Sequence, residues 1–235
     1  MFRHQSDVVV LCDFDGTITN EDIGFNIIQT FAGEGWHEIE DAFQRGEKGS
    51  REALLEIFAL TRVSKETLTR FVDKHFHVDP HFPAFLDLCH TKNIAVTVLS
   101  DGFDFYIDLM FEKFKVDVPY LANKLKVVDC SLHADFPHSS GQCGACGNCK
   151  LDFAKNVKKK GKKIIYIGDG YSDKCVSNLA DVVFAKDVLA DYCREQGTDF
   201  YPFTGFDDIL NVCREKLFAN LLEWEGKDEN SSGCS

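Results

Sequence analysis

The chain has 235 residues, enough for one full domain and a smaller appended one, and its 44% hydrophobic share provides for a substantial core. A formal net charge of -12 argues against nucleic-acid binding, which uses a basic surface to neutralise phosphates, and against docking on anionic membranes. No apolar run approaches the ~20 residues of a membrane span, and the polar start lacks a signal-peptide pattern. We therefore expect a cytoplasmic protein, monomer or homodimer.

Short apolar runs alternate with helical patterns along most of the chain. The apolar runs are typical of strands buried on both faces of a parallel sheet, and they cover Val8–Leu11, Ile94–Leu99, Ile164–Ile167 and Val182–Ala185. The helical patterns between them cover Phe103–Phe114, Leu151–Lys159, Ser172–Leu179 and Val188–Gln196. This alternation predicts a doubly wound, Rossmann-like α/β sheet.

Residues 20–82 depart from the alternation and contain only amphipathic helical patterns, at Asp22–Phe31, Trp36–Gln44, Arg51–Ala59 and Lys65–His75. Ser64 is placed to cap the last of these helices. The pattern predicts an all-helical insert between the first and second strands of a core formed by residues 1–19 and 83–225. Within the core, the Gly- and Cys-rich stretch 120–149 is expected to form a β-hairpin or an irregular flap. The polar tail, 226–235, is expected to be disordered.

Polar residues follow three of the predicted strands directly. The first strand leads into Asp13-Phe14-Asp15-Gly16-Thr17, the second into Ser100-Asp101-Gly102, and the third into Gly168-Asp169-Gly170, with Asp173 nearby. Ligands of open α/β sheets bind outside the carboxyl ends of the strands. The fold is therefore expected to gather these groups in one crevice.

Such a crevice brings together four carboxylates, those of Asp13, Asp15, Asp169 and Asp173. Carboxylates at such short separation repel one another unless a cation compensates their negative charge. A Mg2+ ion held by carboxylates, water and a phosphate fits this set of residues. Lys150 would add a fixed positive charge, and Ser100 a hydroxyl donor. A carboxylate can itself attack phosphorus and form an aspartyl-phosphate. The residues thus favour a phosphomonoesterase acting on a small phosphorylated metabolite.

These motifs resemble those of the haloacid dehalogenase-type phosphatases, in the family's order. Asp13-x-Asp15-Gly16-Thr17 is similar to the first motif, Ser100 to the second, Lys150 to the third, and Gly168-Asp169-x-x-x-Asp173 to the fourth. The resemblance spans residues 8–200. The helical insert matches the family's cap between the first and second motifs.

The resemblance implies a role for each matching residue. Asp13 would be the nucleophile and a Mg2+ ligand. Asp15 would protonate the leaving alcohol, activate the hydrolytic water and reach the metal through its backbone carbonyl. The remaining roles are metal binding by Asp169, orientation of a metal-bound water or of Lys150 by Asp173, and binding of phosphate or substrate by Gly16, Thr17, Ser100, Asp101, Gly102 and Lys150.

Within the family the chain resembles two subgroups with helical caps, the phosphoserine phosphatases and the 2-hydroxy-3-keto-5-methylthiopentenyl-1-phosphate phosphatases of methionine salvage. Features near Pro137-His138, the Cys-rich run before Lys150 and Phe184-Ala185-Lys186-Asp187 favour the salvage group, although Phe136 stands where that group is expected to have Trp. Phosphoserine, phosphocholine or phosphoethanolamine, and pyridoxal phosphate are the alternative substrates. Gly16 counts against the choline and ethanolamine group, which typically has an acidic residue there. Asp22 either contacts substrate or caps a helix.

Ten cysteines without an export signal indicate reduced thiols. Cys143, Cys146 and Cys149 recur at three-residue spacing, which leaves three readings open: a zinc site completed by another ligand, a redox-sensitive pair, or structural thiols. Two functional alternatives also stay open. The fold could serve as a non-catalytic interaction module, or it could transfer the phosphoryl group to an acceptor other than water.

Overall fold

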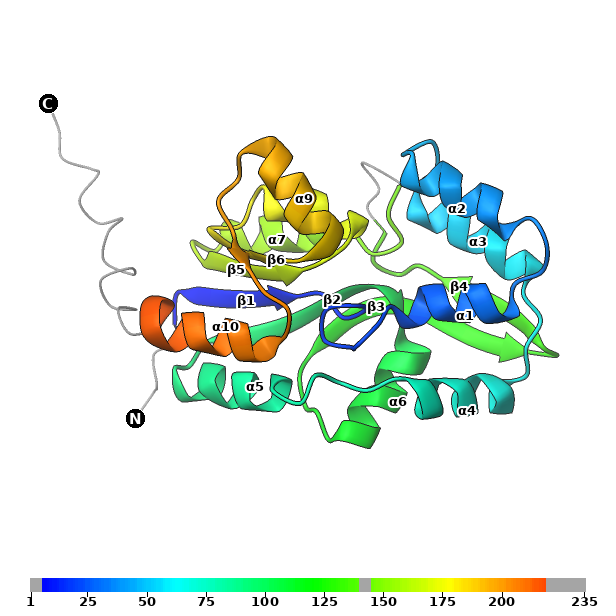
Figure 1. The fold of residues 1–235 in the computed structure, drawn as a ribbon, viewed down its shortest axis with the longest axis horizontal. Helices are drawn as coiled ribbons and strands as arrows, with labels where there is room; N and C mark the ends of the chain where they lie inside the picture. The colour runs from blue at the N-terminus through cyan, green and yellow to red at the C-terminus, as the bar shows by residue number, and fades with distance from the viewer. Residues whose placement is uncertain (1–5, 140–144, 219–235) are drawn as a thin grey trace, which may run out of the picture.

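The computed structural model describes residues 6–139 and 145–218. Its centre is a seven-stranded sheet of order β4-β3-β2-β1-β5-β6-β7 (Figure 1). Every neighbouring pair of strands is parallel except β3 and β4, which are antiparallel. The strands are β1 (Val8–Cys12), β2 (Ala95–Phe103), β3 (Tyr120–Val128), β4 (Ser131–Asp135), β5 (Lys163–Gly168), β6 (Val182–Ala185) and β7 (Tyr201–Pro202).

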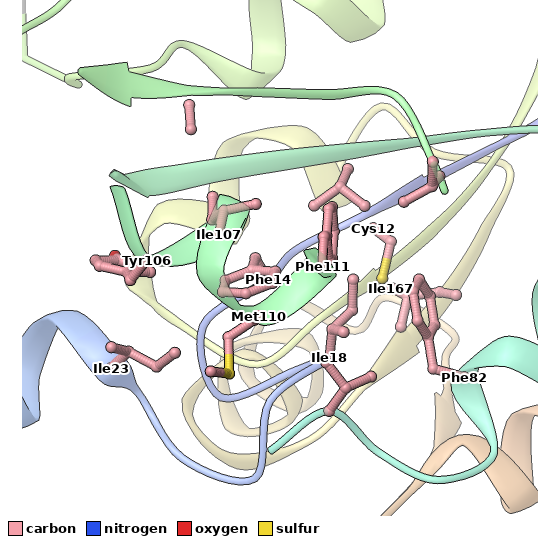
Figure 2. Close-up of a cluster of buried hydrophobic side chains, with 14 of the residues drawn as sticks. Cys12, Phe14, Ile18, Ile23, Phe82, Tyr106, Ile107, Met110, Phe111 and Ile167 are labelled. Carbon is pink, nitrogen blue, oxygen red and sulfur yellow. The ribbon is translucent and has the colours of Figure 1, made fainter. Parts of the chain in front are cut away.

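Helices cover both faces of the sheet, which confirms the predicted doubly wound α/β fold (Figure 1). One face packs against α5 (Phe82–Thr91), α6 (Asp104–Phe114) and α10 (Phe206–Val212), and the other against α7 (Lys150–Lys158) and α9 (Asp187–Gln196). Because both faces are covered, β1 and β5 are apolar along nearly their whole length and buried. Figure 2 shows part of this core, where Phe14 lies among Ile107, Met110 and Tyr106 of α6.

Residues 20–82 fold into four helices, α1 (Ile23–Phe31), α2 (Trp36–Gln44), α3 (Ser50–Leu60) and α4 (Lys65–His75). Two polar side chains start helices as N-caps. Asp22 accepts from the Phe25 N–H, and Ser64 accepts from the Thr67 N–H, as the sequence predicted for Ser64. The insert also touches the hairpin of β3 and β4, because the Val63 N–H donates to the Cys130 carbonyl oxygen at 2.9 Å.

Several elements differ from the sequence expectation. The stretch predicted as a flap does contain a hairpin, but β3 also pairs with β2 and so belongs to the main sheet. Helix α5, strand β7, α10 and a π-helical turn at Cys213–Leu217 were not predicted, and the helix expected at 172–179 is a 3-10 turn, Tyr171–Asp173, followed by α8 (Lys174–Ser177). Cys143 and the tail 226–235 lie outside the described residues. Among the helices of the described part, none is both long and apolar enough to cross a bilayer.

Candidate active site

A tight turn after β1 presents two aspartates at the carboxyl end of the central strand. The Asp13 N–H donates to the Ile167 carbonyl oxygen of β5 at 2.8 Å, so Asp13 is still held in the sheet. The chain then turns over Phe14, whose carbonyl oxygen accepts the N–H of Ile18 at 2.9 Å. Gly16 adopts a φ of 71°, a left-handed conformation that favours glycine. The turn therefore points Asp13 and Asp15 into the crevice outside the strands.

Lys150, the first residue of α7, is buried between two carboxylates. Its Nζ lies 2.5 Å from Asp13 Oδ1, 2.6 Å from Asp173 Oδ1 and 2.9 Å from Ser172 Oγ. Burial on its own lowers the pKa of Lys150, but the two carboxylates outweigh burial and raise it above the usual value. The ammonium therefore stays charged and fixes the position of Asp13, which is 137 residues away in sequence.

Both oxygens of Asp173 are engaged in hydrogen bonds. Oδ1 accepts from Lys150 and from the Tyr166 hydroxyl, whereas Oδ2 accepts from the backbone N–H groups of Asp169, at 3.0 Å, and Gly170, at 2.9 Å. This saturated carboxylate shapes the turn after β5 and orients Lys150. Both carboxylate oxygens of Asp173 thus already accept hydrogen bonds from the protein.

Three carboxylates come close enough to hold one metal ion. Asp13, Asp169 and Asp173 each offer an oxygen atom, and these atoms lie within 4.8 Å of one another. It is the only cluster of three or more potential His, Cys, Asp or Glu ligands found within the described residues. Asp169 is held by Thr17, whose hydroxyl donates to Oδ1 at 2.5 Å. A hard cation that prefers oxygen ligands, such as Mg2+, suits this donor set.

The electrostatics of the cluster favour a cation. Burial, followed by repulsion from Asp173, raises the pKa of Asp13 well above its usual value despite Lys150. Burial and the same Asp173 charge raise the pKa of Asp169 to about 7. One lysine thus leaves the acidic groups incompletely compensated, and a divalent ion would favour their ionised forms.

Asp15 points away from this cluster, toward the helical insert. Its Oδ1 accepts from the Ile23 N–H at 3.0 Å, and its Oδ2 accepts from the Tyr106 hydroxyl at 2.9 Å and from Ser100 Oγ at 3.2 Å. Burial and the nearby Asp22 charge raise the pKa of Asp15 to about 8. A carboxyl group that stays protonated near neutral pH can donate a proton to a leaving group. The side chain of Asp15 is not in the carboxylate cluster.

The second predicted motif lies in the last part of β2, where the pairing with β3 shifts register between Leu99 and Phe103. Besides contacting Asp15, Ser100 Oγ accepts the Gly102 N–H at 2.9 Å, and the residue is buried. Asp101 faces the loop before Lys150 and accepts the Asn148 N–H at 2.7 Å. Gly102 is packed so tightly against Tyr106 and Asp15 that an added Cβ would lie 1.8 Å from the Tyr106 hydroxyl oxygen.

One cavity of about 320 Å³ opens from this site into the helical insert. The sheet side contributes Asp13, Asp15 and Asp169, and Asp22 lies at the boundary as the N-cap of α1. The wall contributed by the insert is mostly apolar, and its lining residues include Phe25, Ile28, Phe43, Ala53, Leu54 and Ile57. Among the described residues that line the cavity, several are acidic and none is basic.

Comparison with known proteins identifies the family to which the chain belongs. The profile of the haloacid dehalogenase-like hydrolase family matches residues 10–176, which include the turn after β1, the Ser100 segment, Lys150 and Asp173. The chain belongs to the haloacid dehalogenase-like hydrolases. Its relatives carry phosphatase names, which identifies the chain as a phosphatase of this family.

Two relatives share the name of one phosphatase. The 2-hydroxy-3-keto-5-methylthiopentenyl-1-phosphate phosphatase of Bacillus velezensis is 29% identical over 204 residues, covering 86% of this chain and 87% of the relative. The enzyme of the same name from Bacillus mycoides is 29% identical and covers 91% and 99%. Among solved structures, the phosphoserine phosphatase from T. onnurineus gives a TM-score of 0.67 at 18% identity, covering 92% and 98%. The structural likeness supports the fold of this haloacid dehalogenase-like phosphatase.

Four polar residues of the site were not found by sequence reasoning. Tyr106 donates to Asp15, Tyr166 donates to Asp173, Ser172 contacts Lys150, and Ser50 lines the cavity from α3. Tyr106 carries a usable signal, because it lies one helical turn after the Ser100 motif on a helix that starts at the site. Tyr166 lies inside an apolar strand, where a sequence pattern indicates only core packing.

Proposed function

We propose that this phosphatase hydrolyses a phosphate monoester with the help of Mg2+ through an aspartyl-phosphate formed on Asp13. The observation that carries the proposal is the direct contact of Lys150 with Asp13 inside a cluster of carboxylates. A lysine in this position neutralises an anionic nucleophile that must approach an anionic phosphate. We assign the phosphoryl oxygens of the substrate to Ser100 and Lys150. The N–H groups of Gly16 and Thr17, which the sequence assigned to phosphate, donate within the turn, to Thr19 Oγ1 at 3.1 Å and to the Phe14 carbonyl oxygen at 3.3 Å.

The residues present fit a bound Mg2+ ion. Asp13 and Asp169 each have one oxygen engaged, by Lys150 and Thr17 respectively, so we assign their Oδ2 atoms to the metal together with the Asp15 carbonyl oxygen. When bound, the ion supplies positive charge that stabilises the charge of the transferring phosphoryl group. Asp173 supports the site by holding Lys150 and the turn that carries Asp169.

In the first step, Asp13 Oδ attacks phosphorus and the ester P–O bond breaks. The leaving oxygen takes the proton of Asp15, which lines the cavity and has a pKa of about 8. In the second step, the ionised Asp15 removes a proton from water, the water oxygen attacks phosphorus, and the bond to Asp13 breaks. Phosphate is released, Asp13 is regenerated, and Asp15 again holds its proton.

The substrate that we favour is 2-hydroxy-3-keto-5-methylthiopentenyl-1-phosphate, with α1–α4 acting as a cap over it. The apolar wall made by Phe25, Ile28 and Leu54 suits a thioether tail. Phosphoserine carries a carboxylate that needs a cationic or other strong donor, and the described lining offers acidic side chains and no basic one. The absence of a basic side chain among the described lining residues thus weighs against the carboxylate of phosphoserine, whereas its ammonium group would find acidic partners.

A second candidate follows from two carboxylates in the cap. Asp22 and Glu40 both line the cavity, close to the rings of Phe25 and Phe43. Acidic and aromatic side chains together suit an amine or a quaternary ammonium group, as in phosphoethanolamine or phosphocholine. An amine-bearing substrate would use Asp22 and Glu40, whereas the salvage substrate would use the apolar wall.

A substrate comparison tests these assignments. We expect kcat/KM for the methylthio-ketopentenyl phosphate to exceed the values for phosphoserine, phosphocholine, phosphoethanolamine and pyridoxal phosphate, with Mg2+ present. Leu54→Asp should reduce that preference, while Asp22→Asn should leave it. A higher kcat/KM for phosphoserine would refute the substrate assignment, and activity in Asp13→Asn equal to wild type would refute the mechanism.

A further inference from the structure

A serine at the start of α3 joins the cap to the loop that precedes Lys150. The Gly147 N–H donates to Ser50 Oγ at 3.1 Å, and the Ser50 hydroxyl in turn donates to the Asp101 carboxylate. Beside this contact, the Arg51 N–H donates to the Ala145 carbonyl oxygen at 3.2 Å. Ser50 therefore acts as acceptor and donor at once, between segments 97 residues apart.

On the core side, this loop is fixed to the ends of two strands. The Asp101 carboxylate accepts the Asn148 N–H at 2.7 Å, and the Asn148 side-chain amide donates to the carbonyl oxygens of Ser100 and Leu121, each at 2.9 Å. Asn148 is buried and lies two residues before Lys150. The loop therefore sets where α7 begins, and with it where the Lys150 ammonium meets Asp13.

The cap and the loop approach each other at backbone distance. A Cβ added to Gly49 would lie 2.3 Å from the Ala145 carbonyl oxygen, and one added to Gly147 would lie 2.8 Å from Asp101 Oδ1. Gly49 has an ordinary φ of -78°, so close approach and not backbone conformation is what requires a glycine there. Ser50 also lines the cavity, so this contact lies at the cavity wall.

We propose that Ser50 is a positioning residue that couples closure of the cap to the placement of Lys150. With the cap closed, the Ser50 hydroxyl completes the hydrogen bonding of Asp101 and of the Gly147 N–H, which holds the loop. With the cap open, that hydroxyl moves away, and the Gly147 N–H and the Asp101 carboxylate both lose their hydrogen bond to Ser50. The inference rests on the proposed role of Lys150 in binding phosphate, but not on the identity of the metabolite.

The test compares Ser50→Ala with Ser64→Ala, a matched control. Both variants remove a serine hydroxyl at a cap helix N-terminus, but the hydrogen-bond partners of Ser64, Thr67 and Glu66, lie within its own helix start. Because Ser50 bonds to a carboxylate, we expect kcat/KM for p-nitrophenyl phosphate to fall about tenfold or more in S50A, with weaker competitive inhibition by inorganic phosphate. We expect changes below about twofold in S64A, and recovery of most activity in Ser50→Thr.

Amide hydrogen exchange of a peptide covering 145–150 gives a second readout that needs no turnover. We expect faster exchange in S50A and unchanged exchange in S64A. Asp101→Asn interrupts the same contact from the core, so its effect and that of S50A should be non-additive in the double variant. Equal phosphate inhibition and exchange in S50A and wild type, or additive effects of S50A and D101N, would overturn the coupling. Absence of phosphatase activity in the wild-type protein would instead refute the proposed function. The two failures can be told apart because hydrogen exchange is measured without turnover.

Discussion

Replacing Asp169 by Asn should stabilise the protein in the absence of metal and destroy its response to Mg2+. The oxygens of the acidic cluster lie within 4.8 Å of one another, and two unit charges at that separation repel by about 3 kcal/mol at an effective dielectric constant of about 20. Asn keeps the volume, and its Oδ1 can still accept from Thr17. Since Asp169 is partly exposed, solvent screening reduces the expected gain to about 2 kcal/mol.

The sign follows from the pKa of about 7, which lies above the usual value for an aspartate. Ionisation of Asp169 therefore costs stability as pH rises from about 4 to 7, and the cost is complete above 7, where Asn removes it. At pH 8 with chelator, the melting temperature of Asp169→Asn should exceed that of wild type by about 4–8 °C. With saturating Mg2+, wild type should gain stability and the variant should not. A lower melting temperature for the variant in chelator, or an equal Mg2+ response in both proteins, would refute the reasoning.

Three further predictions concern single groups of the site. Gly16→Ala should weaken Mg2+ binding more than tenfold in a metal titration, because φ of Gly16 is 71° and the new Cβ would lie 2.6 Å from Asp169 Oδ2. The control is Gly161→Ala, at a φ of 73° with open space around it, which should bind Mg2+ as wild type does. Lys150→Met should lower the free energy of unfolding by about 3–5 kcal/mol in urea titrations, and adding Asp173→Asn should restore part of it; no loss in K150M would contradict the buried ion pair. With alkyl phosphates, kcat should fall above pH 8 as Asp15 loses its proton, and a kcat that does not change with pH there would count against Asp15 as the acid. With p-nitrophenyl phosphate, Asp15→Asn should release one rapid equivalent of p-nitrophenolate before a slow steady state.

The parts of the fold read from sequence were those in which a local pattern coincides with burial. The runs at β1 and β5 are apolar because both faces of the sheet are covered, and the motifs at Asp13 and Asp169 follow these strands directly. Helix α5 escaped prediction because it lies where the insert returns to the core, where Pro83 also opens the helix. Strand β3 contains two lysines, and its pairing with β2 is set by the sheet and not by its own residues.

Within the site, the motifs predicted the acidic residues, and the family resemblance offered Lys150 as one of two partners of Asp173. The structure contains that contact, at 2.6 Å between Lys150 Nζ and Asp173 Oδ1, whereas the tyrosine and serine partners were not predicted. Tyr106 and Ser50 lie on helices, and a helical sequence pattern ordinarily predicts that polar residues face solvent. Their functional importance arises only because α6 and α3 begin next to Asp15 and Asp101.

The central claim is that Asp13 takes the phosphoryl group from the substrate. Asp15→Asn with Mg2+ and p-nitrophenyl phosphate should accumulate the acyl-phosphate, so acid quenching followed by peptide mass spectrometry should find one phosphoryl group on the peptide that contains Asp13, and none in Asp13→Asn. Phosphorylation of another residue, or turnover with no phosphorylated enzyme at any quench time, would contradict the claim.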